Sequence, residues 1–313
     1  MLPAQLKDYS SQVDSVLNLM TIQEKVGQMI QYSNNKLLTG PALDTSNRTE
    51  EIKRGEVGSV FNIITVERAK QYQDLAMQSR LRIPLLFGLD VLHGLKTIFP
   101  IPLAEAASFN LDLMRKTANV AAAETSSLGI HWTFAPMVDV SRDARWGRSM
   151  EGAGEDTWYG SQVAKARIEG FQGSNYDEKR TVLACAKHFA AYGAAVGGRD
   201  YAEADISEHT LQQVYLPPFQ AAVEAGVATF MNAFNEINGI PATAHKILQR
   251  DVLKGKWGFK GFVVSDWGSV GEIAKHRMAK DNKDAGRLAA IAGCDMDMHS
   301  MTCLLYTSPS PRD

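Results

Sequence analysis

Short apolar runs that end at a charged residue recur along this chain, and they constrain its fold more than any other feature. Residues 261–264 (Gly-Phe-Val-Val) lead to Asp266, and residues 85–89 (Leu-Leu-Phe-Gly-Leu) lead to Asp90. An apolar run of this length that stops at a carboxylate is typical of a buried strand that delivers an acid to a cleft. We therefore predict buried strands whose polar ends surround a common pocket.

Eight strand-like segments can be marked, and helical patterns separate most of them. Strands that alternate with helices form parallel sheets with right-handed crossovers. Eight such strands favour a closed barrel over an open sheet, so we predict an α/β fold, a (β/α)8 barrel of the TIM type with its site at the carboxyl ends of the strands. The predicted strands are residues 26–31, 57–62, 84–90, 132–140, 182–189, 227–234, 261–267 and 293–298.

Two of the intervening segments are predicted to be irregular. The pair Pro217-Pro218 must bend or split the helix predicted for residues 207–225, because proline cannot continue a helical hydrogen-bond ladder. The first crossover, residues 33–56, is polar and carries turn residues, so any irregularity of the barrel is expected there. A helix over residues 6–20 is expected outside the barrel. The other predicted helices are residues 65–81, 104–128, 155–171, 245–254 and 283–292.

The 313 residues suffice for one large domain, and no linker or repeat divides them. We assign residues 1–300 to the barrel. Residues 301–313 (Met-Thr-Cys-Leu-Leu-Tyr-Thr-Ser-Pro-Ser-Pro-Arg-Asp) have neither a helical nor a strand period. We interpret them as a tail that is either non-native or disordered.

Composition excludes several classes of partner. The formal net charge is −2, so we expect neither nucleic acid nor an anionic membrane surface to be bound. No apolar stretch approaches the ~20 residues that cross a bilayer. The first ten residues contain no basic start followed by an apolar core, so we expect no signal peptide in this chain. Nothing in the sequence indicates the oligomeric state.

The predicted strand ends present a set of charges suited to a neutral, polyhydroxylated ligand. Sugar hydroxyls need many directional donors and acceptors, and hydrogen bonds to charged groups are the stronger ones. The indole of Trp267 would add a flat apolar platform beside the acid. The charged residues at these ends are Asp90, Arg148, Lys187, His188 and Asp266.

Cofactor chemistry is not indicated. No glycine-rich phosphate loop is present, the seven histidines are scattered, and the three cysteines have no spacing typical of a disulfide framework or a zinc site. We expect no cofactor and no metal. Other interpretations of single residues stay open: Asp266 could cap a helix, Lys187 and His188 could be buried structural groups, and Lys187 could form the Schiff base of another barrel enzyme.

Four motifs together resemble those of glycoside hydrolase family 3, and they occur in that family's order. They are residues 89–94 (Leu-Asp-Val-Leu-His-Gly), 140–148 (Val-Ser-Arg-Asp-Ala-Arg-Trp-Gly-Arg), 185–189 (Cys-Ala-Lys-His-Phe) and 261–267 (Gly-Phe-Val-Val-Ser-Asp-Trp). The resemblance covers residues 13–298 and is greatest to the bacterial periplasmic β-glucosidase type. Ala144 stands where the family usually has proline.

The resemblance implies hydrolysis of terminal, non-reducing β-D-glucosyl residues from β-glucosides and oligosaccharides by a retaining mechanism. Asp266 would be the catalytic nucleophile, and neighbouring Lys and Arg would favour its charged form. Trp267 would shape the entrance and Met231 would line the pocket. The residues implied to hold the sugar are Asp90, Arg148, Lys187 and His188.

The sequence also departs from the family pattern. In two-domain members the general acid/base glutamate comes from a second α/β domain, which we expect to be absent from this chain. A branch that cleaves N-acetylglucosaminides uses a histidine in the loop after the fifth strand, and residues 190–201 contain none. The alternatives are a truncated, non-catalytic carbohydrate-binding barrel, or a β-xylosidase or exo-glucanase of the same family. Relatives of this type are commonly exported, which favours the periplasm or secretion.

Overall fold

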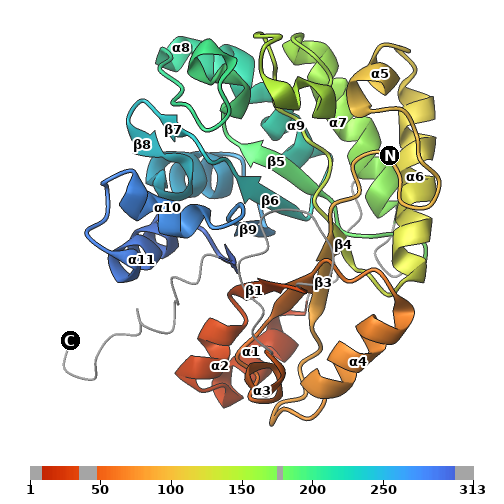
Figure 1. Cartoon of the computed structure of the whole chain (residues 1–313), viewed down its shortest axis with the longest axis vertical. Helices are drawn as coiled ribbons and strands as arrows, with labels where there is room; N and C mark the ends of the chain where they lie inside the picture. Colours follow the sequence, from red (N-terminus) through yellow and green to blue (C-terminus); the bar gives the residue numbers. More distant parts are fainter. Residues whose placement is uncertain (1–8, 35–47, 175–178, 300–313) are drawn as a thin grey trace.

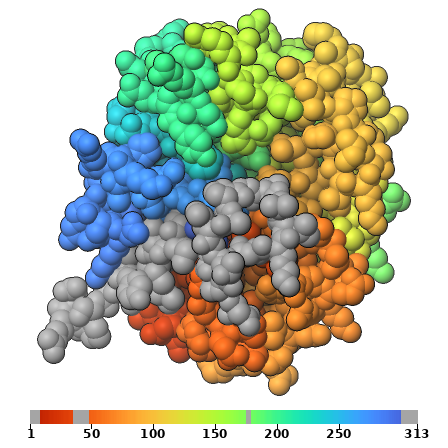
Figure 2. Space-filling model, viewed as in Figure 1, coloured from red at the N-terminus to blue at the C-terminus, as the bar shows by residue number. Residues whose placement is uncertain are grey.

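In the computed structural model, which describes residues 9–34, 48–174 and 179–299, the chain forms a closed barrel of parallel strands surrounded by helices (Figure 1). The sequence winds once around the molecule, so that its first and last thirds lie side by side (Figure 2). The barrel strands are β1 (Ile30–Ser33), β2 (Ser59–Phe61), β3 (Leu86–Leu89), β4 (Trp132–Thr133), β5 (Cys185–Phe189), β6 (Thr229–Asn232), β9 (Phe262–Val264) and β10 (Asp297–Met298).

Parallel pairing closes the barrel in sequence order. One hydrogen-bonded sheet has the order β10-β1-β2-β3-β4, and a second has the order β5-β6-β9. Two single parallel bridges join these sheets, Trp132 with Leu183 and Val264 with Met296. The predicted (β/α)8 barrel is therefore confirmed. A short antiparallel hairpin of β7 (Glu236–Ile237) and β8 (Ile240–Pro241) follows β6.

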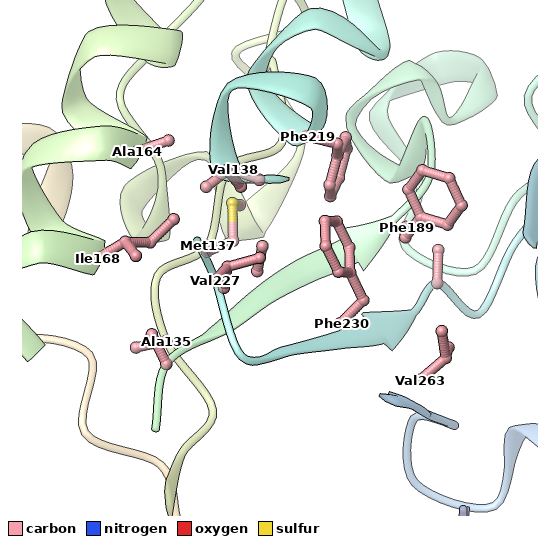
Figure 3. Close-up of a cluster of buried hydrophobic side chains, with 14 of the residues drawn as sticks. Ala135, Met137, Val138, Ala164, Ile168, Phe189, Phe219, Val227, Phe230 and Val263 are labelled. Atoms are coloured by element: carbon pink, nitrogen blue, oxygen red, sulfur yellow. The ribbon is translucent and has the colours of Figure 1, made fainter. Parts of the chain in front are cut away.

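Side chains alternate between the inside and the outside of the barrel along each strand, as the pleat of a strand requires. On β6, Met231 points inward to a cluster with Trp132, and Phe230 points outward to the surrounding helices. Figure 3 shows this outer layer, where Phe219 lies beside Phe189 and Phe230. Inside, the indole N–H of Trp132 donates to Thr229 Oγ1 at 2.8 Å.

The helices cover the outside of the barrel (Figure 1). Their clearest contacts are between α6 and α7, and between α7 and α9. Among the described residues, no helix combines the length and the apolar character needed to cross a membrane. The helices are α1 (Ser10–Leu19), α2 (Ile22–Gly27), α3 (Thr49–Lys53), α4 (Val66–Ala76), α5 (Pro102–Ala106), α6 (Leu111–Ser127), α7 (Thr157–Gln172), α8 (Glu208–Thr210), α9 (Pro217–Glu224), α10 (Ser269–Lys275) and α11 (Asn282–Ala292), with π-helical turns at η4 (Leu211–Tyr215) and η6 (Ile247–Lys256).

Several predicted boundaries were wrong. Val26 belongs to α2 and not to the first strand, because Thr21 and Glu24 form a capping box that starts a helix there. The helix predicted for residues 104–128 is broken in two, since Phe109 takes a positive φ of 51° and the Asn110 side chain caps a new helix. The helix predicted for residues 207–225 splits at its proline pair, as expected.

The structure describes only parts of the first crossover and of the two ends of the chain. Within the first crossover, α3 is the described helix, and residues 35–47 lie outside the described residues. Helix α1 precedes the barrel, and none of its residues is buried. The predicted tail, residues 301–313, also lies outside the described residues.

Candidate active site

The polar ends of three barrel strands meet at one rim. Asp90 directly follows β3, Lys187 and His188 are part of β5, and Asp266 lies two residues beyond β9. Parallel strands bring their carboxyl ends to the same face of a barrel, which explains why residues far apart in the sequence converge. The structure therefore brings together the predicted acidic and basic residues of the site.

Lys187 and Asp90 form a direct ion pair, with 2.9 Å between Nζ and Oδ1. The Lys187 side chain is only 4% exposed, whereas that of Asp90 is 26% exposed. Burial is the largest influence and lowers the pKa of Lys187, but the carboxylates of Asp90, Glu151 and Asp266 together outweigh it, so that the pKa is raised above its ordinary value. Lys187 is therefore a fixed positive charge at the wall of the site.

Asp266 is a buried carboxyl whose side chain is 11% exposed. The backbone N–H of Trp267 donates to its Oδ1 at 2.6 Å. Burial raises its pKa to about 6, although the charges of Arg148 and Lys187 act in the opposite direction. The expectation that Lys and Arg favour the charged form is thus right for these two neighbours, but burial outweighs them. Asp266 is ionised above about pH 6.

His188 lies between two carboxyl groups and is fully buried. Its Nδ1 is 2.8 Å from Asp139 Oδ2, and its Nε2 is 3.6 Å from Asp266 Oδ2. Its pKa is held well below the ordinary value by burial and by the positive charges of Arg148 and Lys187. The imidazole is therefore neutral at pH 7, and it borders the carboxyl of Asp266.

Arg148 is held beside the site rather than in contact with Asp266. It belongs to η1 (Gly147–Glu151), and its guanidinium donates to both carboxylate oxygens of Glu151 at 2.6 and 3.0 Å. It also lies over the ring of Tyr192, 5.6 Å from the centroid. Burial lowers its pKa, but the charges of Glu151 and Asp266 raise it above its ordinary value.

Trp267 and Met231, the two apolar residues predicted for the site, belong to the packing inside the barrel. Met231 is 2% exposed within the inner barrel cluster, and Trp267 packs against that cluster. The indole of Trp267 contacts the ring of Phe61 edge to face, with 5.2 Å between centroids. Met231 therefore lies inside the barrel, and Trp267 lies against the same apolar cluster.

Sequence reasoning missed residues that hold the site together, above all Asp139, Glu151 and Tyr192. Asp139 interrupts an otherwise apolar segment, Met137-Val138-Asp139-Val140, and this was the available signal. Glu151 is three residues after Arg148, a spacing that places both on one side of a helical turn. In the parts of the chain that the structure describes, no three His, Cys, Asp or Glu side chains are grouped so as to bind a metal.

Comparisons with known proteins identify the family. The model of the glycosyl hydrolase family 3 N-terminal domain matches residues 21–308. The chain is 45% identical over 287 residues to a periplasmic β-glucosidase of Salmonella typhimurium, covering 91% of this chain and 37% of that protein. It is also 37% identical over 270 residues to a β-xylosidase of Formosa agariphila, covering 81% of this chain and 37% of that protein.

Solved structures of similar proteins indicate the same family. The fold is similar to that of a β-glucosidase from Listeria innocua in complex with isofagomine, with a TM-score of 0.89 and 40% sequence identity. This match covers 94% of our chain and 42% of the Listeria chain. The chain therefore belongs to glycosyl hydrolase family 3. It spans 37% of the length of the Salmonella and Formosa relatives.

Proposed function

We propose that this chain carries the nucleophile of a retaining β-glucosidase, and that this nucleophile is Asp266. The observation that supports the proposal most is the environment of the Asp266 carboxyl. It is buried at the end of β9, faces His188, and lies within the electrostatic reach of Lys187 and Arg148. A carboxylate that attacks an anomeric carbon must be ionised and poorly solvated, and Asp266 fits this above about pH 6.

The proposed reaction has two displacements at the anomeric carbon. Asp266 Oδ2 or Oδ1 attacks, the bond to the leaving-group oxygen breaks, and a covalent glucosyl-enzyme forms with inverted configuration. Water then loses a proton to the group that protonated the leaving-group oxygen, displaces the carboxylate and restores the β configuration. The first step requires a proton for the leaving group. The family resemblance implies a glutamate of a second domain as the acid/base. We propose that this carboxyl belongs to a region equivalent to the part of the relatives that lies outside the match.

The sugar in the first subsite is proposed to be held by a polar wall and an apolar wall. Asp90 and Lys187 would bind its outer hydroxyls as a pair that can both accept and donate, and Arg148 would add a positive charge. His188 Nε2 would accept from a hydroxyl. Trp267 and Met231 would contact the apolar face of the ring.

Glucosides are the preferred substrate class in this proposal. Solved structures of the Listeria innocua β-glucosidase contain glucose and laminaribiose, and the identity to the Salmonella β-glucosidase is higher than that to the Formosa β-xylosidase. We propose a small β-glucoside or oligosaccharide as the partner. Because the Salmonella relative is described as periplasmic, we also propose export from the cytoplasm.

The test uses 2,4-dinitrophenyl β-glucoside, whose leaving group needs no acid, with azide as an added nucleophile. The parent is expected to form β-glucosyl azide, because azide displaces Asp266 from the covalent intermediate after a first inversion. Asp266→Ala is expected to form α-glucosyl azide, because a single direct displacement inverts once. The same azide anomer from both proteins would refute Asp266 as the nucleophile. The matching xyloside measures the preference for glucosides.

A further inference from the structure

Among the described residues, Asp139 is the one carboxyl within hydrogen-bond distance of His188, and it makes two such contacts. Its Oδ2 accepts the backbone N–H of His188 at 2.8 Å and lies 2.8 Å from Nδ1 of the same residue. The side chains of Asp139 and His188 are 1% and 0% exposed. One oxygen therefore fixes both the main chain and the ring of His188.

We propose that Asp139 is a positioning residue which keeps the ring proton of His188 on Nδ1, so that Nε2 presents a lone pair beside Asp266. This inference rests on the proposed function, because it explains how the environment of the nucleophile is kept. An oxygen that already accepts the main-chain N–H has its other lone pair directed at Nδ1, and a proton there completes the hydrogen bond. A neutral imidazole that donates at Nδ1 has no proton at Nε2.

The position of that proton decides what Asp266 can do. Nε2 is 3.6 Å from Asp266 Oδ2, and within the described part of the chain it has no hydrogen-bond partner. A proton on Nε2 would be donated to Asp266 after a small movement, and this bond would stabilise the carboxylate and weaken it as a nucleophile. With the proton on Nδ1, both atoms are acceptors, and a substrate hydroxyl can donate into the gap between them.

Other charged groups around the pair do not supply this control. Arg148 and Lys187 disfavour a charged imidazole, but they donate to Glu151 and Asp90 and not to a ring nitrogen of His188. The contact that distinguishes the two ring nitrogens is that with Asp139. The ionisable groups facing Asp266 and His188 are Asp90, Asp139, Arg148, Cys185, Lys187, Tyr192 and Tyr201.

The direct test is the tautomer of His188 in the unmodified chain, measured by ¹⁵N NMR on imidazole-labelled protein at pH 8. The burial of Asp139 raises its pKa to about 7, so its carboxyl is ionised at pH 8. The His188 signal is assigned by its disappearance in His188→Gln. We expect a protonated Nδ1 and an unprotonated Nε2. A protonated Nε2 would overturn the proposal, whether or not the protein hydrolyses glucosides.

Two variants of Asp139 distinguish its effect on the His188 ring from a general effect on folding. Asp139→Asn keeps an oxygen for the main-chain N–H and for Nδ1–H, so it should retain the tautomer and the rate of glucosylation by 2,4-dinitrophenyl β-glucoside within about tenfold. Asp139→Leu has the same side-chain branching but no acceptor. It should move the proton to Nε2 and lower that rate by about 10²-fold.

The pH profile gives a readout that a purely structural role would not move. In Asp139→Leu, donation from Nε2 should lower the pKa of Asp266, so the acid limb of kcat/KM should shift to lower pH, while Asp139→Asn keeps the parental limb. A folded Asp139→Leu protein with the parental tautomer and limb would overturn the proposal. If Asp139→Leu does not fold, the NMR result on the parent and on Asp139→Asn decides. A parent that is inactive but has the expected tautomer would refute the proposed function and leave this inference standing.

Discussion

Replacing Asp266 with asparagine should stabilise the folded protein even though it removes the proposed nucleophile. The pKa of this carboxyl is raised from its ordinary value of 3.8 to about 6, chiefly by burial. About two pKa units at ~1.4 kcal/mol each give a cost of about 3 kcal/mol for carrying the ionised group in the fold. With an exposed side-chain fraction of 11%, solvent screening is small.

The sign of the pH dependence follows from the raised pKa. Well below pH 3.8 the carboxyl is protonated in both the folded and the unfolded state, so it has no effect on the free energy of unfolding. As the pH rises towards about 6, the unfolded state loses its proton first, and the folded state loses stability. Asp266→Asn should therefore stabilise by about 3 kcal/mol at pH 8 and by about half of that at pH 5.

Urea unfolding followed by far-UV circular dichroism at pH 5 and pH 8 measures this difference. Asparagine keeps an oxygen for the N–H of Trp267, and its amide can donate to His188 Nε2, so no hydrogen bond is lost. Asp251→Asn, which removes an exposed carboxyl in η6, is the matched control and should show little change. Equal stability of Asp266→Asn and parent at pH 8 would refute the reasoning, as would a gain that does not depend on pH.

Two further predictions concern the site and the barrel. Lys187→Met removes a charge-assisted bond to Asp90 and a positive charge near Asp266, so the KM for an aryl glucoside should rise at least tenfold and the acid limb should move to higher pH. A pH–rate profile checks this prediction. The control is Lys165→Met, which removes an exposed ion pair with Glu224. Gly261→Ala should lower the free energy of unfolding in urea by about 1–3 kcal/mol, because its Cβ would lie 1.9 Å from the carbonyl oxygen of Ala228. Gly147→Ala, which meets no atom within 4 Å, should be near neutral, and a comparable loss there would contradict the packing argument.

The architecture was predictable because the apolar runs and their polar ends follow directly from strand burial. The strand that precedes Asp266 and the strand that contains Lys187 and His188 were located correctly. Boundaries failed where side-chain capping decided them. The capping box of Thr21 and Glu24 starts a helix that includes Val26, which was predicted to lie in a strand. The side chain of Asn110 caps a new helix within a segment predicted to be one continuous helix.

The internal contacts of the site were beyond the sequence because they join segments far apart in the chain. The pair of Lys187 and Asp90 links residues 97 positions apart, and that of His188 and Asp139 links residues 49 positions apart. The raised pKa of Asp266 could not be predicted either, because it depends on a balance between burial and the charges of Arg148 and Lys187, which only the folded arrangement sets.

The central claim is that Asp266 attacks the sugar, and covalent trapping tests it most directly. The chain is incubated with 2-deoxy-2-fluoro-glucosyl fluoride, whose fluorine slows release of the covalent intermediate, and is then digested and analysed by mass spectrometry. The account predicts one added fluoro-glucosyl group on the peptide that contains Asp266, and no label in Asp266→Asn. A stable label on another carboxyl, such as Asp90 or Asp139, would contradict it.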